Sequence, residues 1–165
     1  SVMSAAMPPE EKEKIQKIVD QLDPSDFSSD AVNARGVVIS HADWISTNFK
    51  REKLKIAWKE FFEEWDILIC PQMATPAFEH DHRNYNERTI KVNNQEQSYF
   101  QQIFWAGMIV NAYLPSTVFP TGPSKDGLPI GLQAVSGAYQ DYKTIEFTRL
   151  LAEEIGGFIA PPNYI

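Results

Sequence analysis

The segment Glu79-His80-Asp81-His82 holds the residues of this sequence that are best suited to binding a metal ion. Two histidines separated by one residue in an extended loop can grip a single ion. The alternative is a solvated polar loop after Ala74-Thr75-Pro76, because no cysteine or distant histidine supports the site. We therefore expect no metal ion and no other cofactor.

Two further groups that could take part in a reaction are the thiol of Cys70 and the imidazole of His41. Cys70 ends an apolar stretch before Pro71, and a buried apolar setting raises the pKa of a thiol and makes it inert. His41 follows Ser40 and is expected at the surface, where it would act as a base only beside a nucleophile. We expect both residues to be structural.

Composition and charge limit the classes of partner. The chain has 165 residues, of which 43% are hydrophobic and 22% charged, which is ordinary for one globular domain. The net charge is −7 and basic residues do not cluster beyond Lys50-Arg51 and Lys53, so we expect no nucleic acid partner. No apolar run has membrane-spanning length. A single cysteine fits a reducing compartment, and we expect a cytoplasmic protein.

Hydrophobic periodicity predicts an α/β layer fold, with a mixed sheet flanked by helices. A polar loop is expected over residues 24–36, and a long functional or surface connection over residues 75–98. The helix from residue 100 is apolar nearly all round, which predicts burial on more than one side. Helices are expected over residues 9–22, 40–65, 100–110 and 141–155, and strands over residues 66–71, 116–120 and 130–135.

Several residues are expected to fix where these elements begin and end. Ser40 and Asp43 are spaced as a capping box for the second helix. Asp141 is a candidate cap for the last helix, and Gly156-Gly157 is suited to end it with a left-handed residue.

The stretch from residue 124 to residue 137 predicts a hairpin-like connection. Lys125-Asp126-Gly127 is a turn sequence that reverses the chain between the last two strands. Gly131 within the returning strand indicates that another backbone or side chain approaches closely. Gln133 in the same strand needs hydrogen-bond partners, so we expect it to hold a neighbouring loop.

Two groups of residues are candidates for a ligand pocket. Met73 and Thr75 lie just past the carboxyl end of the strand at residues 66–71, where α/β sheets open into crevices. Trp105, Ile109 and Tyr113 recur at helical spacing and are candidates for an acyl-binding wall. The alternative for both groups is simple packing in the core.

Three ordered motifs resemble the amidase-signature hydrolases. "DGLPIGLQAVSG" is similar to the closing signature of that family, "WDILICPQMATPAF" to one of its strands, and "LPSTVFPTG" to another. The structural residues of these motifs are Pro71, Pro115, Gly131 and Gln133. The resemblance covers residues 40–160, to which residues 1–39 form a lead-in of helix and loop, and the trailing aromatic-proline tail also fits.

The resemblance implies a large mixed sheet flanked by helices and the hydrolysis of carboxamides by a Ser–cis-Ser–Lys triad. That triad belongs to a Gly/Ser-rich region and a preceding lysine, which this sequence does not contain. Its adjacent serine pair, Ser28-Ser29, has no flanking glycine to permit close backbone approach. The sequence also departs from the family before Pro115, with Val110 and Tyr113 where asparagine and glycine are frequent.

We therefore expect residues 1–165 to form a single domain that is the C-terminal portion of an amide hydrolase and is inactive alone. Ser1 at the start of the sequence suggests a trimmed or excised segment. The implied partners are a small-molecule amide in the full-length enzyme and further copies of the chain, because a partial sheet leaves exposed edges that favour a homo-oligomer. The alternative is a stand-alone binding or interaction module derived from the same fold.

Overall fold

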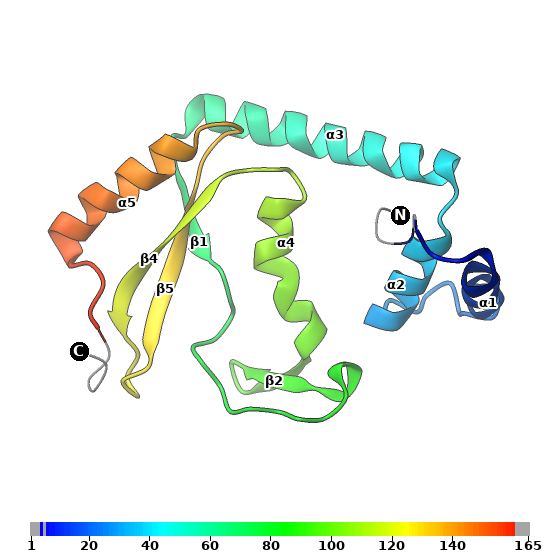
Figure 1. Ribbon diagram of the computed structural model, residues 1–165. Coiled ribbons are helices and arrows are strands. Elements are labelled where there is room, and N and C mark those ends of the chain that lie inside the picture. Colours follow the sequence, from blue (N-terminus) through cyan, green and yellow to red (C-terminus); the bar gives the residue numbers. More distant parts are fainter. Residues whose placement is uncertain (1–3, 5, 161–165) are drawn as a thin grey trace.

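A computed structural model describes residue 4 and residues 6–160 and shows an α/β protein (Figure 1). The trailing Pro161-Pro162 and the starting Ser1 lie outside the described residues. The helices are α1 (Pro9–Val19), α2 (Ser29–Val38), α3 (His41–Glu64), α4 (Phe104–Val110) and α5 (Asp141–Ile155), with 3-10 turns η2 (Tyr85–Glu87) and η3 (Tyr99–Ile103). The strands are β1 (Leu68–Pro71), β2 (Thr89–Val92), β3 (Gln95–Ser98), β4 (Ser116–Pro123) and β5 (Pro129–Val135).

The central sheet has the order β1-β5-β4, so the last strand in sequence lies between the other two. The predicted hairpin is confirmed, because β4 and β5 pair antiparallel from Ser116↔Val135 outward. β1 pairs antiparallel with the other edge of β5. Every strand pair in the described part of the chain is antiparallel, whereas a mixed sheet also needs parallel neighbours. A tight turn between β4 and β5 imposes the antiparallel direction.

Glycine is required at two positions of this hairpin. Gly127 adopts φ 78° in the turn, a conformation that L side chains disfavour. At Gly131 an added Cβ would lie 3.0 Å from the carbonyl oxygen of Phe119 and 3.4 Å from Cγ1 of Val118. The close approach predicted from the sequence is therefore confirmed, and the approaching group is the backbone of β4.

Gln133 is buried at the centre of the sheet and joins all three strands. Its Nε2 donates to the carbonyl oxygen of Pro71 at 2.9 Å, and its Oε1 accepts from the hydroxyl of Ser116 at 3.0 Å. The sequence predicted partners in a loop. The observed partners are the last residue of β1 and the first residue of β4.

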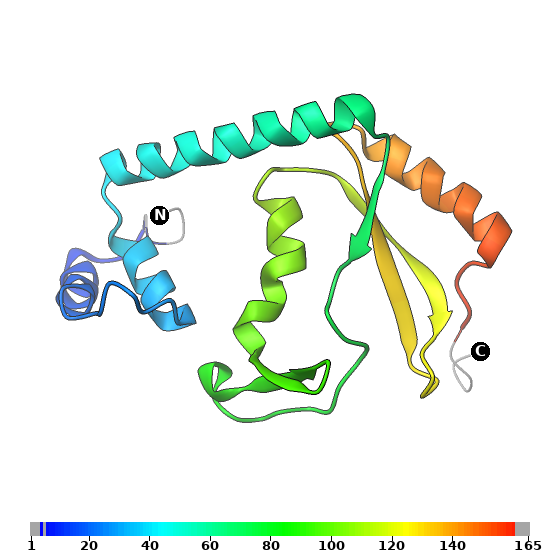
Figure 2. The ribbon, with the colours of Figure 1, turned by 180° about the vertical axis from the view of Figure 1, so that it is seen from behind.

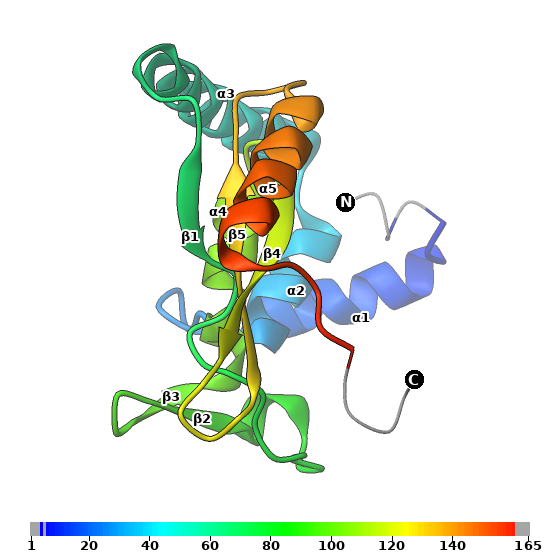
Figure 3. The same cartoon turned by 90° about the vertical axis from the view of Figure 1, so that its left-hand side faces the viewer.

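The core lies where α4 and the end of α3 meet the sheet. Cys70, Ile109 and Val135 are buried there, and they contact the partly buried Phe62, Leu68, Trp105, Met108 and Leu114. α5 lies along β4 and β5 (Figure 3). It is attached by a hydrogen bond of 2.8 Å between the hydroxyls of Thr117 and Thr144.

Two segments differ from the sequence prediction by containing regular structure. Residues 24–36 were expected to be a loop, but α2 begins at Ser29, and the Ser28 side chain caps it by accepting from the backbone N–H of Ala31. Residues 75–98 contain the hairpin β2–β3, which turns through Asn93 and Asn94 at φ 49° and 64°. Asparagine tolerates such angles, so this pair was an overlooked turn signal.

The predicted helix ends are confirmed in part. Ser40 caps α3 by accepting from the N–H of Asp43, which is half of the capping box. The Asp43 carboxylate accepts from the Ser40 hydroxyl at 2.6 Å, whereas the full box pairs it with the backbone N–H of Ser40. Gly156 ends α5 at φ 89°. Asp141 was wrongly expected to be a cap, since Gln140 occupies that position and Asp141 is the first helical residue. An acidic residue there still favours the positive end of the helix dipole.

The burial predicted for the helix near residue 100 is only half correct. Ile109 is 3% exposed, but Ile103, Phe104 and Val110 are 52%, 60% and 67% exposed, because no described element packs over them. α3 likewise has no fully buried side chain. It runs from the sheet to the pair α1 and α2, which lies at its far end (Figure 2).

The Gly131→Val variant tests the close approach between β5 and β4. The added Cβ would lie 3.0 Å from the Phe119 carbonyl oxygen and carries two further methyl groups, so we expect the free energy of unfolding to fall by about 1–3 kcal/mol. Lys125→Ala, in the exposed turn, should remain within about 0.5 kcal/mol of wild type. Thermal and urea unfolding measure both. Equal melting temperatures for wild type and Gly131→Val would contradict the packing argument.

The Gln133→Leu variant tests the hydrogen bonds at the centre of the sheet. Leucine keeps the volume but removes the hydrogen bonds to the Pro71 carbonyl and the Ser116 hydroxyl, so we expect a loss of about 1–3 kcal/mol. Gln95→Leu on the exposed strand β3 is the matched control and should change stability by less than about 0.5 kcal/mol. If both variants unfold at the same urea concentration, Gln133 does not hold the strands together.

Candidate functional site

The serine pair Ser28-Ser29 serves to hold α2 in place. Ser28 is the cap of that helix, and the buried Ser29 donates its hydroxyl to Oδ1 of Asn86 in η2. The Asn86 amide in turn donates to a carboxylate oxygen of Asp30. Both serine hydroxyls therefore have structural hydrogen bonds, and together with Asn86 they connect α2 to the segment before β2.

The His80-Asp81-His82 segment is organised around an ion pair. The rings of His80 and His82 lie edge to face with centroids 6.0 Å apart. Asp81 binds the Arg83 guanidinium at 2.6 Å, and these hydrogen bonds lower the pKa of the carboxyl to about 2. Within residue 4 and residues 6–160, no group of three or more histidine, cysteine or acidic side chains is arranged to hold a metal ion. The carboxylate between the two histidines is therefore engaged by Arg83.

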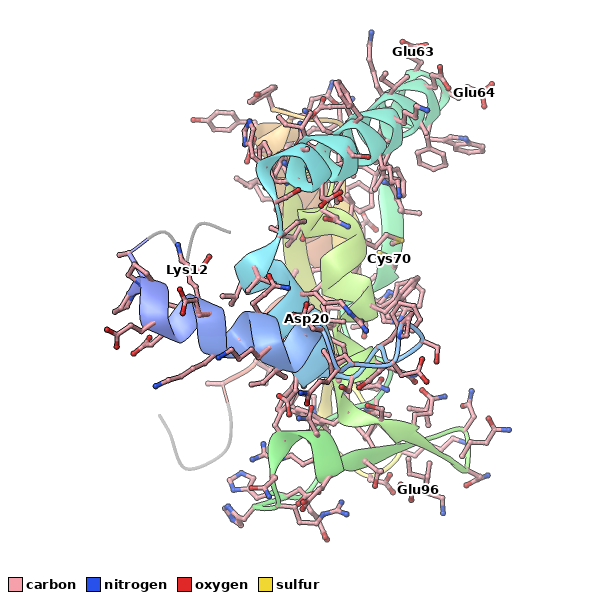
Figure 4. The ribbon with its side chains drawn as sticks, turned by 90° about the vertical axis from the view of Figure 1, so that its right-hand side faces the viewer. Lys12, Asp20, Glu63, Glu64, Cys70 and Glu96 are labelled. Carbon is pink, nitrogen blue, oxygen red and sulfur yellow. The ribbon has the colours of Figure 1, made fainter. Side chains whose placement is uncertain are left out.

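Neither Cys70 nor His41 forms a nucleophile–base pair within the part of the chain that the structure describes. Cys70 is buried opposite Gln133 in the β1–β5 register, and burial raises the pKa of its thiol, with a hydrogen bond to Gln133 offsetting part of the shift. Figure 4 shows Cys70 on β1 inside the protein, with Glu63, Glu64 and Glu96 projecting outward. His41 is exposed and stacks on Trp44.

The predicted wall of Trp105, Ile109 and Tyr113 is not one surface. Ile109 is in the core, and Trp105 packs against it. α4 ends at Val110, so Tyr113 lies beyond the helix at φ 57°, with the Arg51 guanidinium 4.9 Å above its ring. The loss of helical phase after Val110 moves Tyr113 away from the other two residues.

Met73 and Thr75 lie on the segment that follows β1, and both are half-buried. The hydroxyl oxygen of Thr75 is buried and, among the described residues, has no hydrogen-bond partner. A buried hydroxyl without a partner is costly, so such a group is suited to pairing with a ligand or an added segment of protein.

A hollow of about 580 Å³ lies beside α4 and brings Trp105 together with Ala74, the residue between Met73 and Thr75. Its size is within the range typical of small-molecule sites. The sequence analysis missed most of its lining, although the dense aromatic residues around Trp105 were the available signal. The lining residues are Phe27, Ala74, Gln97, Phe100, Gln101, Gln102, Ile103, Phe104 and Trp105.

Comparison with known proteins identifies relatives of this chain. The amidase family model matches residues 10–145. A glutamyl-tRNA(Gln) amidotransferase subunit of Chlamydia pneumoniae is 33% identical over 96 residues, covering 58% of this chain and 18% of the relative. The corresponding subunit of Alkaliphilus metalliredigens is 28% identical over 113 residues, covering 68% of this chain and 21% of the relative.

Solved structures share the fold. An amidase superimposes with a TM-score of 0.62 at 18% identity, covering 88% of this chain. The glutamyl-tRNA(Gln) amidotransferase subunit of Thermotoga maritima gives a TM-score of 0.61 at 19% identity and covers 98% of this chain.

The chain spans about a fifth of the length of these curated relatives and 32% of each of these two solved chains. No helix among residue 4 and residues 6–160 combines the length and apolarity needed to cross a membrane. Because the family model matches well over half of its residues, this chain belongs to the amidase family.

Proposed function

We propose that this chain is the C-terminal portion of an amidase-signature hydrolase that cleaves carboxamide C–N bonds. It supplies sheet strands, covering helices and part of the substrate pocket, as one domain, while the nucleophile and its lysine come from the remainder of the enzyme. The family match to a chain that spans about a fifth of its relatives carries the proposal. The full enzyme needs no metal or cofactor, since serine chemistry supplies the nucleophile.

The three family motifs support this role because they converge on one small sheet. Gln133 joins Pro71, and Pro115 accepts a hydrogen bond from the backbone N–H of Ser136 at 3.3 Å. Gly131 lies against Phe119 on the neighbouring strand. These motif residues therefore hold strands together, so their role in this chain is structural and not catalytic.

The exposed surface also supports the proposal. The chain exposes 12549 Å², whereas a compact monomer of 18.8 kDa is expected to expose about 8,300 Å². The excess of roughly 4,200 Å² is more than one standard protein interface buries. The comparisons favour additional amidase sequence as the protein that covers this surface. When the chain is isolated, further copies of the same chain can cover it instead.

For the pocket, we propose that Trp105, Met73 and Thr75 face the small-molecule amide. Ile109 supports Trp105 from within the core. Tyr113, which lies beside Arg51 beyond the end of α4, remains a predicted substrate contact outside the lining of the hollow. A cytoplasmic location fits the single reduced cysteine. The alternative is a stand-alone binding module, and the coding sequence upstream of Ser1 discriminates the two. A Gly/Ser-rich segment with a preceding lysine favours the hydrolase.

The isolated chain is expected to have no amidase activity. Both hydroxyls of the Ser28-Ser29 pair are engaged in holding α2, so the chain should neither hydrolyse simple carboxamides nor react with a fluorophosphonate probe. Ammonia release and intact-mass spectrometry measure these properties. A longer polypeptide that includes the upstream region is the positive control. Stoichiometric labelling of any serine in the short chain would reveal a nucleophile and overturn this expectation.

The isolated chain is also expected to associate with itself. Exposed Ile103, Phe104 and Val110 and the excess surface favour a homodimer or larger species. Light scattering coupled to gel filtration across a dilution series should show a mass above 18.8 kDa that falls on dilution. A compact monomer at every concentration, without binding of an apolar dye, would show that the piece is self-sufficient.

A further inference from the structure

The outward face of α3 is suited to pairing with a second copy of this chain, a role that goes beyond the proposed function. Figure 2 shows α3 along one edge of the molecule, with the sheet, α4 and the pair α1 and α2 together on its inner side. The helix has 24 residues, about 36 Å of length, and no buried residue. We propose that α3 pairs antiparallel with α3 of a second copy, with the two-fold axis beside Ala57.

One stripe of exposed residues on α3 points away from the rest of the chain. Phe62 packs against the core and Lys55 lies over the Tyr113 ring, so these two residues mark the inner face of the helix. An α-helix turns by about 100° per residue, so residues spaced alternately by three and four positions share one face. Figure 4 shows Glu64, the last of the stripe, projecting outward. The exposed stripe opposite the inner face consists of Lys50, Lys53, Ala57, Glu60 and Glu64.

The four charges of this stripe have no ion-pair partner among the described residues. Other charges of α3 are paired within the helix, Glu52 with Lys55 at 3.0 Å and Lys59 with Glu63 at 3.9 Å. In the stripe, two lysines lie together and two glutamates lie together, and like charges at these spacings destabilise a helix. Glutamates in the last turns also oppose the helix dipole. The arrangement is therefore unfavourable within one chain.

A second copy that runs in the opposite direction supplies a partner for all four charges. With Ala57 at the two-fold axis, Lys50 is level with Glu64 of the second copy, because both lie seven residues from Ala57. The 1.5 Å rise per residue brings Lys53 within about 1.5 Å of the level of Glu60 of the second copy. Two-fold symmetry forms each pair twice. Parallel pairing would instead set lysine against lysine and glutamate against glutamate, so the charges specify the antiparallel direction.

Ala57 and its apolar neighbours provide the contact itself. The distance between packed helices depends on the side chains at the contact, and alanine permits a close approach. Ile56 lies on one flank of the stripe and Leu54 on the other, and they are 56% and 38% exposed, so pairing removes apolar surface from water. Exposed ion pairs add little affinity on their own. The charges therefore set direction and register, while the apolar flanks contribute to binding.

This surface differs from the exposed apolar surface of α4. α4 lies on the inner side of α3 (Figure 1), and its exposed residues do not belong to the stripe. Additional amidase sequence can therefore cover α4 and the flank of α3 beside it while the outward stripe pairs. The dimer is accordingly expected in the full-length polypeptide that contains residues 1–165, and the experiments use that polypeptide.

Cross-linking tests the position of the two-fold axis. Ala57→Cys places two thiols beside the axis, so we expect a disulfide-linked dimer under mild oxidation. Ala42→Cys is the matched control, because it changes an exposed alanine of the same helix that would lie about 45 Å from its copy. It should cross-link at less than a tenth of the rate. The native Cys70 is buried, and the wild type gives the background. Electrophoresis without reductant measures the linked fraction.

Charge exchange tests which ends of the helices meet. Lys50→Glu with Lys53→Glu makes the stripe wholly acidic, and Glu60→Lys with Glu64→Lys makes it wholly basic. Each double variant should weaken dimerisation at least about tenfold, because four attractive pairs become repulsive. An equimolar mixture of the two variants should restore dimers as mixed pairs, and all four changes in one chain should restore the homodimer. Analytical ultracentrifugation measures each mass.

A control on another helix separates specific pairing from net charge. Lys14→Glu with Lys17→Glu changes two exposed lysines of α1 and alters the net charge as the acidic variant does, so dimerisation should stay unchanged. A wild type that is monomeric at every concentration, or equal cross-linking of the two cysteine variants, would overturn the inference. So would dimerisation that charge exchange leaves unchanged, or a mixture that fails to recover. None of these outcomes depends on amidase activity, so the proposed function is tested separately.

Discussion

The amide of Gln133 is the interaction on which the central sheet depends. β1 is only four residues long and lies at the edge of the sheet, where it pairs with β5 alone. The hydrogen bond from Gln133 to Pro71 adds a link at the end of β1, and the bond from Ser116 adds a second link to the start of β4. A buried amide is tolerated because both ends of it are paired. Removing either hydrogen-bond partner of Gln133 would leave a buried polar group without a hydrogen bond. The three strands are therefore held in place by one side chain.

The sequence predicted the features that local chemistry decides. The Ser40 cap, the hairpin through Gly127 and the close approach at Gly131 each follow from one residue type with a restricted conformation, and the structure confirms them. The Asn93-Asn94 turn also follows from residue type, so the same reasoning could have predicted it. The helix α2 was not predicted. Its helically spaced apolar residues, Ala31, Ala34 and Val38, have short side chains, and the polar residues and glycine between them are typical of a loop.

The candidate site was less predictable than the fold because it depends on contacts between distant segments. Helical spacing placed Tyr113 beside Trp105 only while the helix continued, and the helix ends at Val110. Phe27 reaches the hollow through the links between α2 and Asn86, which are separated by more than fifty residues in sequence. Periodicity reports neither the end of a helix nor a hydrogen bond between distant loops.

The small core explains why the surroundings of the hollow matter so much. Half of the buried apolar residues that the structure describes are small (Ala31, Cys70, Ala112 and Ala134), Phe119 is the largest at 5% exposed, and α3 has no buried residue. The chain therefore depends on hydrogen bonds within the sheet and on polar links such as Ser29–Asn86 to keep its parts in position. Additional amidase sequence packed over α3 and α4 would replace water at the exposed aromatic side chains. It would also fix the distance between Phe27 and Phe104. On this argument the neutral lining of the hollow is encoded in this chain, whereas a covering segment would set its depth and its rigidity.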